Sequence, residues 1–291
     1  MRAVDIHCHP MTKEWDQAFG QFTPGLEATF KQKYPIKSEE EMAEDFRKDD
    51  VVAMMIGWDA ESATGAGRRI DNDWIASLSE KYPDVFLPGW AVVDPWKQSA
   101  ACEELERAIK DLGLTGAKFQ PPVQAFYPND HRFYPMWDTL QSLGAPALIH
   151  AGTTGLGWGL PGGGGVHLKY GRPIPGIDDV AADFPDLTII AAHPGHPWHE
   201  ELIAILVHKP NVYLDVCGWR PRYIPESLKR QIRSRLKDKV LFGSDYPSWT
   251  PGQCIKEFEE EGYGDDVLQA MFFDNATRVL NLRERVPALF G

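Results

Sequence analysis

Five residues of the types that bind transition metals stand at or near the ends of short apolar segments. They are His7, His9, His150, His193 and Asp245. Neutral imidazole is a good ligand for zinc, iron and manganese, and a carboxylate adds charge compensation. Such a set predicts a site for one divalent metal with a remaining position for water or a substrate.

The stretch HCHP, residues 7–10, places two of these imidazoles on a predicted first strand. Side chains on a strand alternate between its two faces, so His7 and His9 are expected to point the same way and Cys8 the opposite way. Pro10 cannot donate a hydrogen bond to a neighbouring strand and is expected to end this one. A lone histidine is most often structural, so the company of the other ligands is what favours a metal site.

Eight apolar runs, bounded by Gly, Pro or Asp, predict eight strands. They span residues 4–10, 51–59, 85–95, 115–121, 146–152, 187–195, 212–219 and 240–247. Amphipathic stretches at helical spacing lie between them, at residues 39–50, 71–84, 97–113, 133–144 and 225–238. This alternation predicts a (β/α)8 TIM barrel in one domain over residues 1–291, with a doubly wound open sheet as the alternative. In such a barrel the C-terminal ends of the strands carry the active site, and the candidate ligands fall there.

The composition narrows the class of partner. The formal net charge of −12 repels a phosphate backbone and an anionic membrane surface, so neither nucleic acid nor membrane is expected. The four cysteines are scattered without a CxxC pair, and the chain has no long apolar run and no secretory signal pattern. We therefore expect a cytoplasmic protein with a small-molecule substrate, and a homo-oligomer is left open.

The motifs resemble a known family. HxH on the first strand, histidines after the fifth and sixth, and an aspartate after the eighth resemble the amidohydrolase superfamily of metal-dependent barrels. The segments GAKFQP, LIHAGTTG, IIAAHPG, NVYLDVCGW and VLFGSDYP resemble its amidohydrolase-related branch, amidohydrolase 2. That branch includes aminocarboxymuconate semialdehyde decarboxylase, resorcylate decarboxylases and lactone hydrolases. The resemblance covers essentially the whole chain, and its motifs are specific for metal and fold but not for substrate.

The resemblance implies a ligand set and two catalytic residues. His7, His9, His150 and Asp245 would bind one divalent metal, with zinc as the first expectation and manganese as the alternative. His193 would contact the metal-bound water or the substrate, and Asp245 or His193 would relay a proton.

Two further polar residues on predicted strands have two readings each. Several members of the superfamily carry a carboxylated lysine on the fourth strand that bridges two metals, and Lys118 lies on that strand. We favour Lys118 as a contact for an anionic substrate, because the branch is usually mononuclear. Asp215 would hydrogen-bond a metal-bound histidine or be a buried structural carboxylate.

Residues at the predicted mouth of the barrel are candidates for holding a substrate. Trp198 and Trp219 follow strand candidates and would form an aromatic pocket or pack loops. Arg220 would bind a carboxylate or phosphate with its guanidinium fork. Thr153 begins a Gly-rich segment, residues 153–173, that is too long for an ordinary connection and is expected to act as a flexible lid.

Three functions fit these residues. The favoured one is a metal-dependent hydrolase whose activated water attacks a carbonyl of a small organic acid, ester, lactone or acyl compound, including β-ketoacyl substrates. The alternative is a non-oxidative decarboxylase, in which the metal chelates a carboxylate and a protonated side chain delivers a proton to carbon. The first histidine of HxH favours the hydrolase, because some aromatic-acid decarboxylases of the branch carry glutamate there. The third is a metal-binding protein without turnover, against which the complete ligand set argues.

Overall fold

Eight parallel strands, paired in sequence order, form a barrel in the computed structural model, which describes residues 1–65 and 69–290. The strands are β1 (Ala3–Cys8), β2 (Val51–Ile56), β3 (Phe86–Val92), β4 (Gly116–Phe119), β5 (Ala147–His150), β6 (Ile189–Ala192), β7 (Val212–Asp215) and β8 (Val240–Leu241). The amide of Ile6 donates to the carbonyl oxygen of Phe242 at 3.1 Å, which joins the first strand to the segment after the last. The predicted TIM barrel is thus confirmed and the open sheet is wrong, while the single domain over residues 1–291 stays a prediction.

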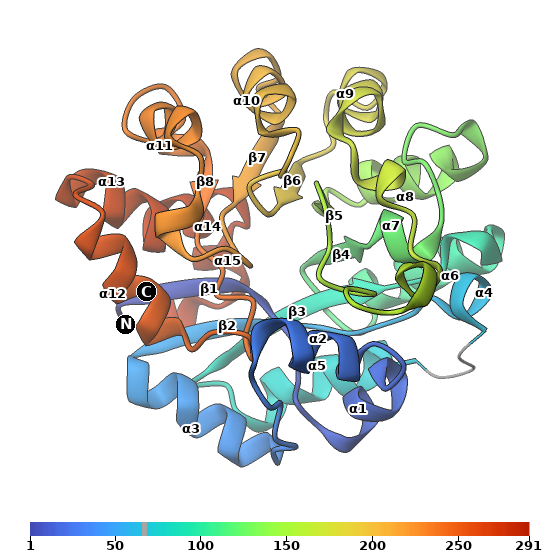
Figure 1. The fold of residues 1–291 in the computed structure, drawn as a ribbon, viewed down its shortest axis with the longest axis horizontal. Coiled ribbons are helices and arrows are strands. Elements are labelled where there is room, and N and C mark those ends of the chain that lie inside the picture. The colour runs from blue at the N-terminus through green and yellow to red at the C-terminus, as the bar shows by residue number, and fades with distance from the viewer. Residues whose placement is uncertain (66–68, 291) are drawn as a thin grey trace.

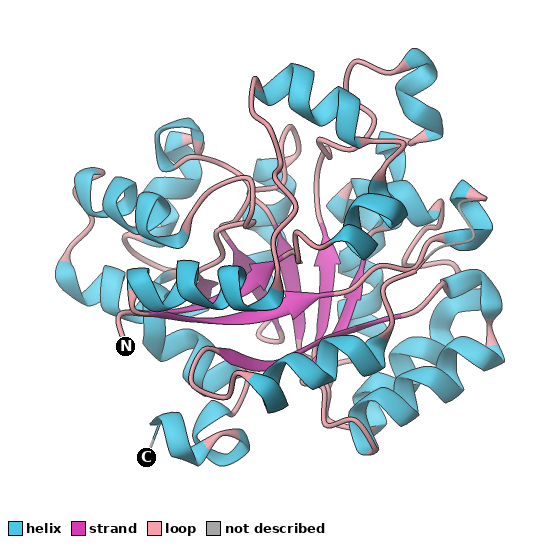
Figure 2. Cartoon of the chain, turned by 90° about the horizontal axis from the view of Figure 1, so that it is seen from below, coloured by secondary structure: helices cyan, strands magenta, loops and turns pink. Residues whose placement is uncertain are grey.

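Helices surround the barrel on its outside, as Figures 1 and 2 show. They include α3 (Glu39–Asp49), α5 (Asn72–Lys81), α6 (Ser99–Lys110), α8 (Tyr134–Ser142), α9 (Pro173–Asp183), α10 (His199–His208), α11 (Glu226–Ile232) and α12 (Pro251–Glu260). The start of α3 shows why the sequence forms a helix there. Ser38 and Glu41 make a reciprocal capping box, and Met42 and Phe46, four residues apart, bury one face.

The first strand is irregular at the point where its histidines begin. Val4 and Ile6 pack in the apolar cluster inside the barrel, whereas Cys8 packs in the outer layer between strands and helices. The pairing of β1 with β2 shifts between Asp5 and Cys8, so His7 also turns inward, directly after Ile6. The Asp5 carboxylate stabilises this bulge by accepting the amide of His7 at 3.2 Å.

The C-terminal segment closes the end of the barrel opposite the histidines. It comprises α14 (Asn275–Val279), α15 (Leu282–Arg285) and α16 (Pro287–Phe290). Its buried side chains, among them Leu280 and Phe290, belong to the same apolar cluster as Val4 and Ile6. With one end sealed by apolar packing, the mouth formed by the C-terminal ends of the strands is the end at which a ligand can enter.

Two segments roof this mouth. The first is α1 (Lys13–Phe19) with α2 (Thr23–Phe30), and the second is the Gly-rich segment, which contains the 3-10 turns η3 (Pro161–Gly165) and η4 (Leu168–Gly171). A Cβ added to Gly25 would lie 2.2 Å from the carbonyl oxygen of Trp158, so the two segments touch through their backbones. The expected lid is therefore packed against α2.

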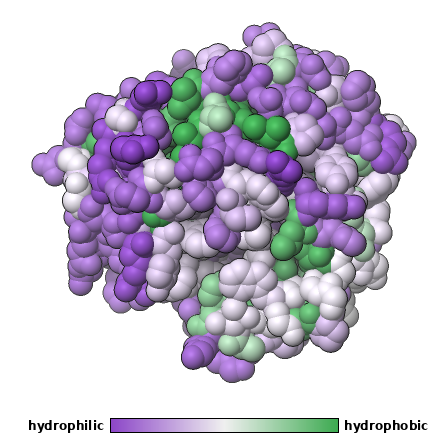
Figure 3. Space-filling view, turned by 45° about the horizontal axis from the view of Figure 1, so that its top comes forward, coloured by the Kyte–Doolittle hydropathy of each residue, from purple (hydrophilic) through white to green (hydrophobic). Residues whose placement is uncertain are grey.

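The outer surface is largely polar (Figure 3), as expected for a chain with a net charge of −12. Hydrophilic side chains cover most of the face in Figure 3, with smaller hydrophobic patches between them. Among the described residues, no helix is long and apolar enough to cross a membrane.

Candidate active site

The closure of the barrel brings the first and last predicted ligands together. The amide of Asp245 donates to the carbonyl oxygen of His7 at 3.0 Å, and the amide of His9 donates to Tyr246 O at 2.7 Å. Asp245 and His193 both have left-handed backbones, with φ of 58° and 72°. This conformation costs a non-glycine residue free energy, and residues that keep it often cluster at active sites.

Three of the predicted ligands form a compact group. Nε2 of His9 lies 3.4 Å and Nε2 of His7 lies 3.7 Å from Oδ1 of Asp245, and the two imidazole rings are 5.2 Å apart between centroids. One ligand atom from each of the three residues lies within 4.8 Å of the others. Two imidazoles and a carboxylate at this spacing suit a divalent transition metal.

Asp215 orients the innermost of these ligands. Its Oδ2 lies 2.6 Å from Nδ1 of His7, so Nδ1 carries the proton and Nε2 keeps the lone pair that a metal could bind. Burial raises the pKa of Asp215 to about 6, which leaves the carboxylate mostly ionised at neutral pH. Asp215 is thus placed to hold the ring of His7, a predicted metal ligand, in one orientation.

His150, the fourth predicted ligand, lies outside the compact group. Its ring centroid is 4.4 Å from that of His193, and its Nε2 donates to Thr153 O at 3.1 Å. Its Nδ1 is buried and has no hydrogen-bond partner among the described residues. A buried imidazole nitrogen without a partner suits a ligand atom, because a buried polar atom left unpaired is costly.

His193 lies between this histidine and the compact group. Its ring centroid is 5.1 Å from that of His7, and its Nδ1 donates to Cys217 O at 3.2 Å. A Cβ on Gly218 would lie 2.6 Å from Nδ1 of His193 and 3.0 Å from Oδ2 of Asp245. A glycine at position 218 therefore allows His193 and Asp245 to approach each other across its backbone.

Burial sets the protonation of the site. Burial lowers the pKa of His7, His150 and His193, which favours the neutral imidazoles that metals bind. Burial alone would raise the pKa of the Asp245 carboxyl, but a hydrogen bond from His9 and the adjacent imidazoles hold it below its usual range. Asp245 is therefore ionised at neutral pH.

Lys118 adds a buried positive charge to the group. Its Nζ lies 3.3 Å from Nε2 of His7, and its side chain points into the barrel from β4. Burial lowers the pKa of Lys118 to about 8, so the ammonium form still predominates at neutral pH. None of the ion pairs among the described residues includes Lys118, which leaves its charge available to an anion.

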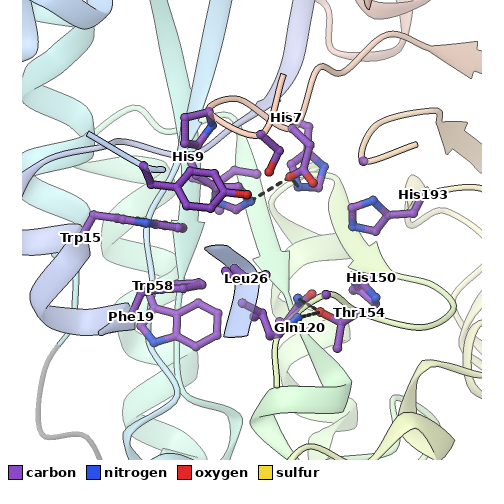
Figure 4. A pocket seen from close by; sticks show the side chains of 18 of the residues that line it. His7, His9, Trp15, Phe19, Leu26, Trp58, Gln120, His150, Thr154 and His193 are labelled. Atoms are coloured by element: carbon purple, nitrogen blue, oxygen red, sulfur yellow. Dashed lines mark hydrogen bonds and ion pairs between the residues drawn. The ribbon is translucent and has the colours of Figure 1, made fainter. Parts of the chain in front are cut away.

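These groups line a cavity of about 350 Å³ at the mouth of the barrel. Figure 4 shows Trp15, Phe19 and Trp58 on one side of it and His193 and His150 on the other. The cavity thus combines a polar wall that suits a metal and an anion with an aromatic wall that suits a flat ring.

The predicted substrate contacts divide into two groups. Thr153, Trp219 and Arg220 line the cavity, whereas Trp198 does not and lies at the start of α10. The guanidinium of Arg220 is already paired with Glu257, to whose Oε2 its Nε donates at 2.9 Å. Arg220 is therefore less available to a substrate anion than Lys118.

Several residues that line the cavity were not predicted from the sequence as site residues. Trp15, Phe19 and Leu26 come from α1 and α2, and Gln120 follows Lys118 by two residues. Gln120 had a weak signal in the alternation of β4, because residues two apart share a face. The short helices after β1 gave no such signal in the sequence, because their apolar residues follow the pattern of any amphipathic helix that connects two strands.

Comparisons with known proteins give a family and two curated relatives. A family model described as amidohydrolase matches residues 4–282. The chain is 32% identical over 98 residues to gamma-resorcylate decarboxylase of Polaromonas sp., covering 32% of this chain and 29% of the relative. It is 24% identical over 247 residues to 2-amino-3-carboxymuconate-6-semialdehyde decarboxylase of Dictyostelium discoideum, covering 72% of this chain and 65% of the relative. Each match thus spans less than two thirds of the relative's length.

A solved structure shares the fold over almost the whole chain. It is a dihydroxybenzoic acid decarboxylase from Polaromonas sp. with bound manganese and the inhibitor 2-nitroresorcinol. Its TM-score is 0.69 at 19% identity, with 97% of this chain and 98% of that chain covered. At this identity the likeness shows the fold.

The comparisons overturn the preference for a hydrolase, which was wrong. Both curated relatives are decarboxylases, and they support the alternative reading instead. The physical reason for the error is that the two reactions use nearly the same residues. A histidine rather than a glutamate at position 7 therefore does not separate them.

Proposed function

This chain belongs to the amidohydrolase family, and on that premise we propose that it is a metal-dependent, non-oxidative decarboxylase of an aromatic or similarly flat, conjugated acid. The names of the two curated relatives, decarboxylases of a resorcylate and of a carboxymuconate semialdehyde, support this reaction class. We expect it to act in the cytoplasm, where the four free cysteines would stay reduced.

One observation carries the proposal: the ammonium of Lys118, which has no ion-pair partner among the described residues, lies beside the ligand group. Its Nζ lies 3.3 Å from His7 in a cavity whose facing wall is aromatic. A carboxylate needs a positive partner when it leaves water, and a flat ring packs well on aromatic side chains. Both needs of an aromatic acid are met in this one cavity.

The residues that would hold the metal are His7, His9 and Asp245, with His150 as the fourth ligand that the family resemblance implies. When bound, a divalent metal would supply positive charge that attracts the substrate carboxylate and offsets the negative charge that develops in the reaction. A decarboxylase of the same fold holds manganese, so manganese joins zinc as an ion to test.

The protein's own side chains would position the acid and exclude water. The Lys118 ammonium binds the carboxylate, while Trp15, Phe19 and Trp58 pack against the ring. Because these walls are apolar, they disfavour water around the reacting carbon, and charges inside the cavity interact more strongly than in bulk solvent.

A proton must replace the carbon dioxide that leaves. Cleavage of the bond between the ring carbon and the carboxyl carbon leaves an electron pair on the ring, which takes up a proton. The Nδ1 of His193 is held by Cys217 O, so its Nε2 has the lone pair that can collect a proton and return it. Asp245, an ionised carboxylate across Gly218 from His193, would be the second proton acceptor in this transfer.

The test is carbon dioxide release by metal-loaded protein. Protein loaded with manganese or zinc is incubated in heavy water with a panel of hydroxybenzoic acids, and headspace carbon dioxide and product spectra are recorded. We expect carbon dioxide equimolar with a product that carries one deuterium at the former carboxyl position. Hydrolysis of esters or lactones, without carbon dioxide from any acid, would overturn the proposal.

A further inference from the structure

Gln120 places an unsatisfied amide oxygen at the cavity. Its Oε1 is shielded from solvent and has no hydrogen-bond partner among the described residues. Its Nε2 donates to Oγ1 of Thr154 at 3.5 Å, an interaction that Figure 4 marks. A buried acceptor without a donor costs free energy, and this one lies where a ligand can supply the donor.

Hydrogen bonds hold the backbone of Gln120, which fixes the point from which its side chain extends into the cavity. The amide N–H of Gln120 donates to Oε1 of Gln124 at 2.8 Å. The side chain of Gln124 in turn donates to Asp59 O at 2.8 Å and to Val93 O at 2.9 Å. These bonds tie the end of β4 to the loops after β2 and β3, and Pro121 follows directly.

The spacing of Gln120 from Lys118 suits an aromatic acid. The two residues are two apart on one extended segment, so their side chains leave the same face, about 7 Å apart along it. The spacing between the attachment points of the two side chains is thus comparable to the distance from the carboxylate of a benzoic acid to a group on the far side of its ring. A carboxylate on Lys118 would thus place a distal substituent near Gln120.

The walls between these two points are apolar. Phe19, Leu26 and Trp58 line the cavity with Gln120, and Figure 4 shows them beside it. An apolar wall gives affinity for a ring but little choice between ring substituents, whereas a buried hydrogen-bonding group rejects a ligand that leaves it unpaired. Gln120 therefore gives this part of the cavity a polar group that can distinguish between ring substituents.

We infer that Gln120 is a specificity-determining residue whose Oε1 accepts a hydrogen bond from a hydroxyl or amino group on the substrate ring, meta or para to the carboxylate. This inference rests on the proposed function for its substrate class. It narrows that class to ring acids with a hydrogen-bond donor distal to the carboxylate.

The experiment measures binding and turnover separately. Calorimetry with the manganese-loaded protein gives the Kd of benzoate, 3- and 4-hydroxybenzoate and 4-methoxybenzoate, and headspace carbon dioxide is followed in parallel. We expect one hydroxybenzoate to bind about tenfold more tightly than benzoate, a preference that Gln120→Leu removes and Gln120→Glu, which keeps an acceptor, retains.

Gln231→Leu is the matched control. Oε1 of Gln231 is also buried and has no hydrogen-bond partner in the part of the chain that the structure describes, but Gln231 lies on α11 and not at the cavity. This variant should keep the hydroxyl preference of the wild type. The same preference in wild type and Gln120→Leu would overturn the inference, as would tighter binding of 4-methoxybenzoate or no binding of any benzoate.

The two readouts separate this inference from the proposed function. A hydroxyl preference that depends on Gln120, without carbon dioxide release, would support the recognition by Gln120 and reject decarboxylation. Carbon dioxide release with a preference that Gln120→Leu leaves unchanged would support decarboxylation and overturn the role of Gln120.

Discussion

The backbone amide of Asp245 donates a hydrogen bond to the carbonyl oxygen of His7 at 3.0 Å. His7 lies in the first strand and Asp245 follows the last, so the bond that helps to close the barrel also assembles the ligand group. The group is complete only when the barrel is closed. Metal binding should therefore stabilise the folded protein, because the unfolded chain has no comparable site.

His9→Ala tests this coupling between metal and fold. His9 lies at the mouth of the barrel. Its carboxylate contact is with Asp245, whereas the buried Asp215 holds His7, so the loss of His9 should leave the fold intact. We expect bound metal below about a tenth of the wild-type content, since outer partners alone change metal affinity 10–100-fold. The rise in Tm that added manganese gives the wild type should vanish. His208→Ala, an exposed histidine at the end of α10, is the control and should keep both.

Asp215→Asn tests the orientation of His7. The uncharged amide is a weaker acceptor for Nδ1 of His7, so the ligand atom Nε2 becomes less basic and its ring less fixed. We expect metal affinity, measured by competition with a chelator, to fall by about 10–100-fold. Asp186→Asn, at an exposed position, should leave it unchanged. Equal affinities in the two variants would assign Asp215 a structural role only.

Gly218→Ala separates damage to the site from backbone strain. Both Gly218 and Gly262 have φ of +73°, but only at position 218 would a Cβ collide with His193 and Asp245. Either alanine should cost about 1–2 kcal/mol of stability through the left-handed backbone. Only Gly218→Ala should lose most of its activity. A Gly262→Ala variant that loses as much activity would attribute the effect to strain.

Lys118→Met and Arg220→Met identify the cation that binds the substrate carboxylate. Lys118 has no ion-pair partner among the described residues, whereas Arg220 is paired with Glu257. We expect Lys118→Met to weaken benzoate binding by at least about tenfold, the size of one hydrogen bond to a charged group, and Arg220→Met to change it by less than about twofold. Benzamide, which has no charge, should bind all three proteins alike. The reverse order would return the role to Arg220.

The barrel could be predicted from the sequence because its strands are short apolar runs that end in Gly, Pro or Asp. The end of a strand is also visible in a sequence, and this placed His7, His9 and Asp245 at one mouth. Their close approach depends on a bulge in β1 that turns Ile6 and His7 to the same side. Simple alternation does not predict such a bulge, because it arises from pairing with β2 and from the Asp5 carboxylate.

Residues beyond the strand ends were less predictable. Trp198 follows β6 by only a few residues, yet the loop carries it to the start of α10 and away from the cavity. The aromatic wall instead comes partly from Trp15 and Phe19 of α1, the helix that follows β1, and their amphipathic pattern does not mark them as cavity residues. The course of a loop is set by tertiary contacts, such as the approach of Gly25 to Trp158, and these contacts leave no local pattern.

The most direct test of the central claim is a metal titration of carbon dioxide release. Metal-free protein is titrated with manganese in the presence of the hydroxybenzoic acid that the panel selects, and the initial rate is followed against metal per chain. We predict a rate that starts near zero, rises linearly and saturates at about one equivalent, as expected for one site built from His7, His9 and Asp245. A rate that is independent of metal would contradict a metal-dependent decarboxylase, and saturation at two equivalents would contradict a single metal and place Lys118 among the ligands.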